Sequence, residues 1–248
     1  MSFLKKLKEP HSSDHVDVDR IIDENTPFAI CEAFKAMYSK VLYLPVADNC
    51  KKIAITSYIS GEGKTYVSTN FAITLAQNLN KRILLIDMDM RKPRVMRLLQ
   101  KYISTNKEGY GLSEYLVGIH SEPYITKTSL DNLDIVLSGK EVSNPTGLIS
   151  SPKMDQFIKT CEQSYDYVLF DCPPVGIVSD ALLLNDKLNG YILTARANYS
   201  NIDDLDNAVN DLKNLGAEVF GIVLTATNPK INKKTYKRYA NTYEKSVE

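Results

Sequence analysis

The residues with the clearest chemical potential lie in a short glycine-rich segment. Residues 61–65 read Gly-Glu-Gly-Lys-Thr; an apolar run over residues 53–57 predicts a strand before them, and a helix is expected to begin near Thr65. Glycines let backbone N–H groups turn toward a phosphate, and a helix N-terminus adds partial positive charge. The Lys64 ammonium can then reach the β- and γ-phosphates, and the Thr65 hydroxyl can ligate magnesium. Tyr58 stands where the strict pattern has glycine, and an ordinary glycine turn is the alternative.

A second group of candidate residues follows the apolar run over residues 83–86. The chain continues as Asp87-Met-Asp89-Met-Arg91. Alternation along a strand places both carboxylates on the same side at its carboxyl end, where ligands bind in parallel sheets. Two carboxylates beside a triphosphate can hold magnesium through water and accept a hydroxyl proton. An acidic strand end by itself is more often a solvated loop, so this prediction depends on its neighbours.

The third candidate is Asp171, which directly follows the apolar residues 168–170. An aspartate after a buried strand is the second acidic signature of phosphate-loop proteins, where it orders the magnesium shell. The three strand ends together supply one lysine, one hydroxyl and three carboxylates. The sequence therefore predicts a site for a nucleoside triphosphate and Mg²⁺.

The elements that must position these groups alternate between strands and helices. Strands are predicted at residues 53–57, 83–88, 133–137, 167–170, 190–194 and 219–225. Several of them are continuous apolar runs, which are typical of strands buried on both faces of a parallel sheet. Thr26 and Ser151 each precede a proline, which is a helix N-cap signal, and an apolar stripe over residues 202–215 ends at Gly216. This alternation predicts an α/β fold with a doubly wound, mostly parallel sheet flanked by helices.

Composition excludes several other classes of protein. The 248 residues include 30 basic and 30 acidic side chains, so no nucleic-acid partner is expected. Hydrophobic residues make up 44% of the chain, which is enough for a packed core. The four cysteines lack Cys-x-x-Cys spacing and predict neither a zinc site nor a disulfide framework. No apolar run approaches the roughly 20 residues of a membrane span, and no signal peptide is recognisable, so we expect a cytoplasmic protein.

The predicted organisation has three parts. Residues 1–25 form a flexible leader, residues 26–229 the phosphate-loop domain, and residues 230–248 a tail with six basic and two acidic side chains. Basic neighbours of the tail tyrosines argue against their burial, although the tyrosine spacing also fits one face of a short helix. These tyrosines are Tyr236, Tyr239 and Tyr243.

In combination the motifs resemble those of the bacterial protein-tyrosine kinases of capsule and exopolysaccharide biosynthesis, over roughly residues 26–228. The first family motif corresponds to residues 56–65, with Ser60 where proline is usual. The second motif, an apolar run followed by Asp-x-Asp-x-Arg, matches residues 86–91 fully. In the third motif, an apolar run followed by Asp, a hydroxyl residue and Pro-Pro, Cys172 replaces the hydroxyl residue.

The resemblance implies an ATP- and Mg²⁺-dependent protein-tyrosine kinase and suggests roles for individual residues. The nucleotide-binding set is Ser60, Gly61, Glu62, Gly63, Lys64, Thr65, Tyr66 and Arg91. The catalytic set is Lys64, Asp87, Asp89 and Asp171. Thr65 is expected to bind the metal directly, and the three aspartates to shape its outer shell. Either Asp87 or Asp89 takes the proton of the incoming tyrosine, and Arg91 binds phosphate or, in the favoured role, pins its loop by an ion pair.

Two further family features concern assembly and the tail. The family phosphorylates its own C-terminal tyrosines between neighbouring subunits, which implies Tyr236, Tyr239 and Tyr243 as acceptors. It also assembles rings through a Glu-x-x-Arg-x-x-Arg motif on an early helix, which corresponds here to Glu32, Lys35 and Tyr38. Lysine lacks the planar fork of arginine and tyrosine lacks the charge, so the motif for a homo-oligomeric ring is weakened.

The resemblance also implies partners and leaves alternatives open. A transmembrane activator of polysaccharide export would hold the kinase at the inner face of the membrane, and a protein-tyrosine phosphatase would reset the tail. One alternative is an ATP-dependent assembly switch of the same superfamily, but such switches carry a lysine where this chain has Ile59. Another alternative is a kinase-like scaffold that binds ATP and works through partners. Phosphate on the tail tyrosines distinguishes the kinase from both.

Overall fold

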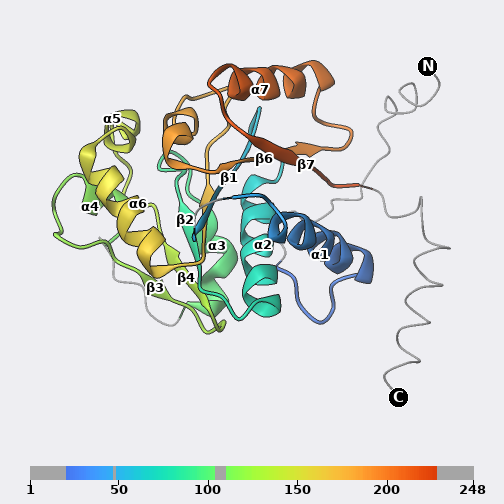
Figure 1. Cartoon of the computed structure of the whole chain (residues 1–248), viewed down its shortest axis with the longest axis horizontal. Coiled ribbons are helices and arrows are strands. Elements are labelled where there is room, and N and C mark those ends of the chain that lie inside the picture. Colours follow the sequence, from blue (N-terminus) through green and yellow to red (C-terminus); the bar gives the residue numbers. More distant parts are fainter. Residues whose placement is uncertain (1–20, 47–48, 104–109, 228–248) are drawn as a thin grey trace.

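In the part of the chain that the structure describes, seven strands form one sheet that carries helices on both faces (Figure 1). The computed structural model describes residues 21–46, 49–103 and 110–227. The strands are β1 (Lys51–Ser57), β2 (Ile83–Asp87), β3 (Thr126–Lys127), β4 (Leu133–Val136), β5 (Tyr167–Asp171), β6 (Gly190–Arg196) and β7 (Val219–Thr225). Their order is β3-β4-β2-β5-β1-β6-β7, and only the β3–β4 pair is antiparallel. The predicted doubly wound, mostly parallel sheet is confirmed.

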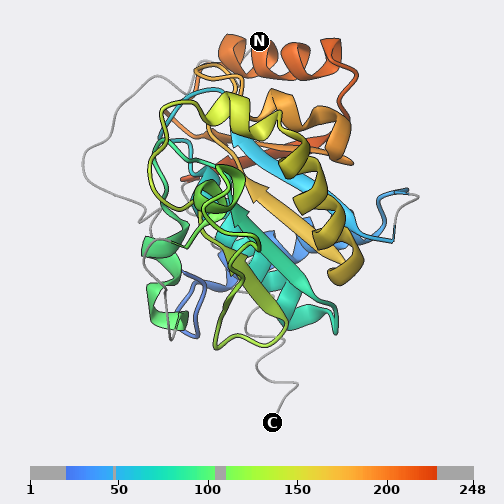
Figure 2. The same ribbon diagram turned by 90° about the vertical axis from the view of Figure 1, so that its left-hand side faces the viewer.

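Two apolar cores lie on opposite faces of this sheet. The helices are α1 (Phe28–Leu42), α2 (Lys64–Asn78), α3 (Val95–Leu99), α4 (Leu112–Leu116), α5 (Pro145–Ile149), α6 (Pro152–Ser164) and α7 (Ile202–Asn214). Side chains of α1, α2 and α3 pack in one core, and side chains of α4 to α7 pack in the other. Along β2 the side chains alternate between the cores, with Leu84 in one and Leu85 in the other. Figure 2 shows the strands side by side between these helices.

The helix ends follow the sequence signals in two of three places. The Ser151 hydroxyl accepts a hydrogen bond from the Met154 N–H at 3.3 Å, as predicted for the N-cap of α6. Gly216, with φ of +74°, follows the last turn of α7. The prediction of Thr26 as an N-cap is wrong, because α1 has Pro27 at this position and no side-chain cap. The Thr26 hydroxyl is engaged upstream, where it accepts from the N–H of Asp23 at 2.9 Å.

The strand predictions differ from the structure mainly at their ends. All six predicted strands are present, and every residue of β2 and β5 is buried, as their continuous apolar runs predict. β2 ends at Asp87, one residue earlier than predicted. The short edge strand β3 was not predicted, because two residues carry no periodic signal. Among the described residues, no helix combines the length and the apolar character needed to cross a membrane.

Candidate functional site

The glycine-rich segment connects β1 to α2 at the carboxyl edge of the sheet. Gly61 and Gly63 have φ angles of +87° and +91°, a region that favours glycine. A Cβ atom added at Gly63 would lie 3.1 Å from the Thr225 Cγ2 atom, a tight contact from which the Thr225 side chain would have to shift. The sequence therefore needs glycine at these positions to make the loop.

The backbone of this loop is arranged to receive an anion. Within the part of the chain that the structure describes, the N–H groups of Gly61, Glu62 and Gly63 donate no hydrogen bond. α2 begins immediately afterwards at Lys64, whose side chain is largely buried. Unpaired N–H groups, a helix N-terminus and a lysine together form a cradle for phosphate.

A cleft of about 170 Å³ opens beside the loop. Eight residues predicted for the site line it: Ser60, Gly61, Gly63, Lys64, Thr65, Tyr66, Asp89 and Arg91. Lys92, Arg94 and the Pro173-Pro174 pair also line the cleft, and the sequence analysis assigned them no role. The cleft is thus lined by four basic side chains and one acidic side chain, so its charge favours a polyanionic ligand. The basic residues are Lys64, Arg91, Lys92 and Arg94, and the acidic residue is Asp89.

Glu62 has a different position from the rest of the nucleotide-binding set. Its side chain is buried and does not line the cleft. One carboxylate oxygen accepts from the Ile59 N–H at 3.0 Å, and the other accepts from the Ser200 hydroxyl. The Glu62 side chain thus holds the shape of the loop, and only its backbone N–H is available to a ligand.

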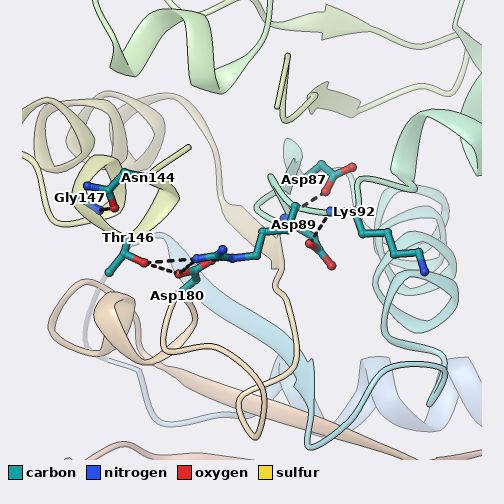
Figure 3. A network of polar contacts seen from close by, with 8 residues as sticks. Asp87, Asp89, Lys92, Asn144, Thr146, Gly147 and Asp180 are labelled. Carbon is teal, nitrogen blue, oxygen red and sulfur yellow. Dashed lines mark hydrogen bonds and ion pairs between the residues drawn. The ribbon is translucent and has the colours of Figure 1, made fainter. Parts of the chain in front are cut away.

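The two aspartates of the second motif occupy different environments. Both oxygens of the buried Asp87 accept backbone N–H groups, from Asp89 at 3.2 Å and from Arg94 and Val95 at 3.2 and 3.1 Å. Asp89 lines the cleft and accepts the Lys92 N–H at 2.9 Å (Figure 3). Asp87 therefore anchors the chain leading into α3, whereas Asp89 faces the cleft.

Asp171 lies in register with Asp87 on the adjacent parallel strand. Burial raises the pKa of Asp171 to about 6, although the nearby Thr65 hydroxyl and the Lys64 charge act to lower it. Both carboxylate oxygens are buried and neither accepts a hydrogen bond of good geometry among the described residues, although the Thr65 and Ser68 hydroxyls lie close enough to lower the pKa. An anionic oxygen pair left in this state costs free energy unless a cation or its water shell satisfies it.

This donor set fits magnesium. Mg²⁺ takes oxygen ligands, keeps several waters and commonly uses one or two protein groups together with substrate phosphates. The Thr65 hydroxyl and the buried Asp171 oxygens are such groups, and they lie beside the phosphate cradle. In the described ranges no three carboxylate, imidazole or thiol groups converge to hold a metal by themselves.

Arg91 is held by an ion pair, the role favoured from the sequence. Its Nε and Nη2 atoms donate to the two oxygens of Asp180 at 2.9 and 3.3 Å. Asp180 is only 1% exposed and also accepts the Thr146 hydroxyl at 2.9 Å. The network joins the Asp89 loop to α5, and no role was predicted from the sequence for Asp180 or Thr146.

Two groups of predicted residues lie elsewhere. On α1, the Lys35 ammonium pairs with the Glu32 carboxylate at 2.9 Å, and both side chains are exposed. Tyr38 packs against one of the apolar cores. The leader, and the tail with its three acceptor candidates Tyr236, Tyr239 and Tyr243, lie outside the described residues.

Comparison with known proteins identifies the family. Residues 50–218 match a protein-family model described as an AAA domain. The tyrosine-protein kinase CpsD of Streptococcus pneumoniae serotype 4 is 33% identical over 187 residues, which cover 75% of this chain and 80% of that kinase. The chain belongs to the bacterial tyrosine-protein kinase family. A putative tyrosine-protein kinase of the same kind, CapB of Staphylococcus aureus, is 31% identical over 79% of this chain and 83% of its own length.

Solved structures agree with this assignment. The VpsO kinase domain superposes with a TM-score of 0.70 and 29% identity, covering 80% of this chain and 96% of that domain. The kinase domain of the Escherichia coli tyrosine kinase ETK has a TM-score of 0.75 and 24% identity, over 91% and 86% of the two chains, and shows the shared fold. The predicted family, phosphate-loop fold and protein-tyrosine kinase class are confirmed. Nucleotide binding with Mg²⁺ follows from the phosphate-loop family.

Proposed function

We propose that this kinase transfers the γ-phosphoryl group of ATP to its own C-terminal tyrosines and thereby regulates capsule or exopolysaccharide synthesis and export. The observation that carries the proposal is the cleft lined by Lys64, Thr65 and Asp89, with the buried Asp171 carboxylate close to Lys64 and Thr65. Residues 26–229 form the catalytic domain, and residues 230–248 form the tail with the acceptors. Those acceptors are Tyr236, Tyr239 and Tyr243.

The loop and Lys64 bind and orient the triphosphate. The N–H groups of residues 61–63 surround the phosphates, and the Lys64 ammonium contacts the β- and γ-phosphates. Thr65 and Asp171 would hold Mg²⁺, the first directly and the second through water, and the ion would supply charge neutralisation at the phosphates. Positioning and charge neutralisation account for most of the rate in phosphoryl transfer, because the transition state is loose.

Asp89 is the better placed of the two candidate bases. A phenol has a pKa near 10, so its proton must leave as its oxygen attacks the γ-phosphorus. A base must reach the phenol in the cleft, and Asp89 lines this cleft. Asp87 does not line it, and both of its carboxylate oxygens already accept backbone hydrogen bonds. The phosphoryl–oxygen bond to the tyrosine forms as the bond to ADP breaks, and Asp89 takes the phenol proton.

The proposal includes partners. The cytoplasmic segment of a transmembrane activator of polysaccharide export holds the kinase at the inner face of the membrane, and a protein-tyrosine phosphatase removes the phosphate. A homo-oligomeric ring would use α1, where the Glu32–Lys35 ion pair keeps both charges within one chain. That pairing and the loss of charge at Tyr38 weaken the ring relative to an arginine-containing motif.

Replacing Tyr236, Tyr239 and Tyr243 together with phenylalanine is expected to remove most of the phosphotyrosine that forms with Mg·ATP and the activator segment, because these residues supply the acceptor hydroxyls. The amount and position of phosphate are measured by mass spectrometry of peptides. The matched control is Tyr43→Phe, since Tyr43 is 82% exposed and does not line the cleft. Undiminished phosphotyrosine in the triple variant would contradict the tail as acceptor.

A further inference from the structure

Three successive carbonyl groups of the phosphate loop accept hydrogen bonds from side chains outside the loop. The Tyr199 hydroxyl donates to the Ser60 carbonyl at 3.1 Å, and the Arg196 Nη1 atom donates to the Gly61 carbonyl at 3.3 Å. The Thr225 hydroxyl donates to the Glu62 carbonyl at 2.8 Å. Arg196 ends β6, Tyr199 lies between β6 and α7, and Thr225 ends β7. We call these three residues the carbonyl clamp.

The clamp residues are themselves held in place. The Ala197 N–H donates to the Thr225 carbonyl at 3.0 Å, which ties the two strand ends together. The Ser200 hydroxyl accepts the Arg196 N–H at 2.7 Å and also bonds to the Glu62 carboxylate. The guanidinium of Arg196 lies 5.5 Å from the centre of the Tyr199 ring, within the range of a cation–π contact. The clamp is thus a built feature that contacts the loop from the side opposite its N–H groups.

Peptide geometry gives these contacts a consequence for the ligand site. In a trans peptide, the carbonyl of one residue and the N–H of the next lie in one plane and point in opposite directions. Holding the carbonyls of residues 60, 61 and 62 therefore aims the N–H groups of residues 61, 62 and 63 away from the clamp. These are the three N–H groups that lack partners among the described residues.

We propose that Arg196, Tyr199 and Thr225 are positioning residues for the nucleotide: by holding three loop carbonyls, they preorganise the N–H groups that bind phosphate. The inference rests on the proposed ATP site and adds residues that no sequence motif identified. Without the clamp the loop must order itself when nucleotide binds, and the free energy of ordering lowers affinity. The clamp contacts no transferred group, so its main effect is on nucleotide binding and not on the chemical step.

The test compares Tyr199→Phe with the wild-type chain in ADP titrations with Mg²⁺ and in kinase assays. Tyr199 is 53% exposed and the substitution keeps its ring, so the fold is preserved while one donor is lost. We expect the Kd for ADP and the KM for ATP to rise about 3- to 10-fold, the range of one hydrogen bond, with kcat changed less than about twofold. Tyr43→Phe, on an exposed ring that does not line the cleft, should leave the values unchanged.

A second pair of variants tests the same claim at the other strand end. Thr225→Val removes the hydroxyl at nearly constant volume and should weaken ADP binding. Thr225→Ser keeps the hydroxyl donor and should bind ADP with the wild-type affinity. Wild-type affinity in both Tyr199→Phe and a folded Thr225→Val would overturn the clamp. Equal loss in the valine and serine variants would also overturn it, because packing and not the hydroxyl would then be responsible. Failure of the wild-type chain to bind Mg·ADP would instead count against the proposed ATP site.

Discussion

Replacing Lys64 with methionine is expected to lower tyrosine phosphorylation at least about 100-fold, the usual effect of removing one preorganised charge-stabilising group from an active site. Lys64 is the first residue of α2 and lines the cleft beside the unpaired N–H groups of the loop. Methionine has a similar length but no charge, so it cannot stabilise the negative charge shared by the β- and γ-phosphates in the transition state. The rate is measured as phosphotyrosine formed with Mg·ATP and the activator segment.

The fold should survive this substitution. The Lys64 side chain is largely buried, and methionine fills irregular apolar space without requiring a charge partner. Circular dichroism and thermal unfolding should therefore match the wild-type chain. Lys81→Met is the matched control, because Lys81 is a surface residue paired with Asp166 at 3.1 Å and does not line the cleft. Retained turnover in Lys64→Met, or an equal loss in Lys81→Met, would remove Lys64 from the mechanism.

Asp171→Asn is expected to abolish magnesium-dependent nucleotide binding and, in the metal-free protein, to raise the free energy of unfolding by roughly 1 to 3 kcal/mol near neutral pH. The Asp171 pKa of about 6 lies above the ordinary value of 3.8, because burial penalises the carboxylate. An asparagine side chain carries no charge to bury. The same substitution is thus predicted to stabilise the fold and to remove the function.

The raised pKa of Asp171 also predicts how the free energy of unfolding depends on pH. The folded state holds the Asp171 proton more tightly than the unfolded state, so the metal-free wild-type chain loses stability as pH rises from about 4 through about 6. The difference in free energy of unfolding between Asp171→Asn and the wild type should therefore be small near pH 4 and reach its full value above pH 6. Urea unfolding of both chains near pH 4 and above pH 6, with a chelator present to remove metal, measures this difference. A variant that is less stable than the wild type at neutral pH, or that gains as much stability from Mg·ADP, would contradict the assignment.

The sequence predicted the elements whose signals are local and repeated. The short, continuous apolar runs of β2 and β5 are typical of buried strands. The three motifs at the ends of β1, β2 and β5 meet at one edge because these strands are neighbours. Hydroxyl capping was less predictable. Ser151 caps α6, but the Thr26 hydroxyl does not cap α1. It bonds instead to the N–H and the carboxylate of Asp23, which compete with the helix N-terminus for this hydroxyl.

The parts of the site that sequence could not predict depend on contacts between distant segments. Asp180 holds Arg91 across 89 positions, and Tyr199 reaches Ser60 across 139 positions. Neither residue belongs to a motif, and the side chain of Asp180 becomes significant only because folding buries it beside a guanidinium. The difference between Asp87 and Asp89 has the same origin, because the chain leading into α3 supplies the N–H groups that engage Asp87.

The most direct test of the central claim is transfer of labelled γ-phosphate from ATP to tyrosine by the purified full-length chain, with Mg²⁺ and the activator segment present. The account predicts phosphotyrosine that requires Mg²⁺, is absent in Lys64→Met, and appears on an added Lys64→Met chain when the wild-type enzyme is present. Tight binding of Mg·ATP without any phosphotyrosine under these conditions would contradict the kinase and favour an assembly switch or scaffold.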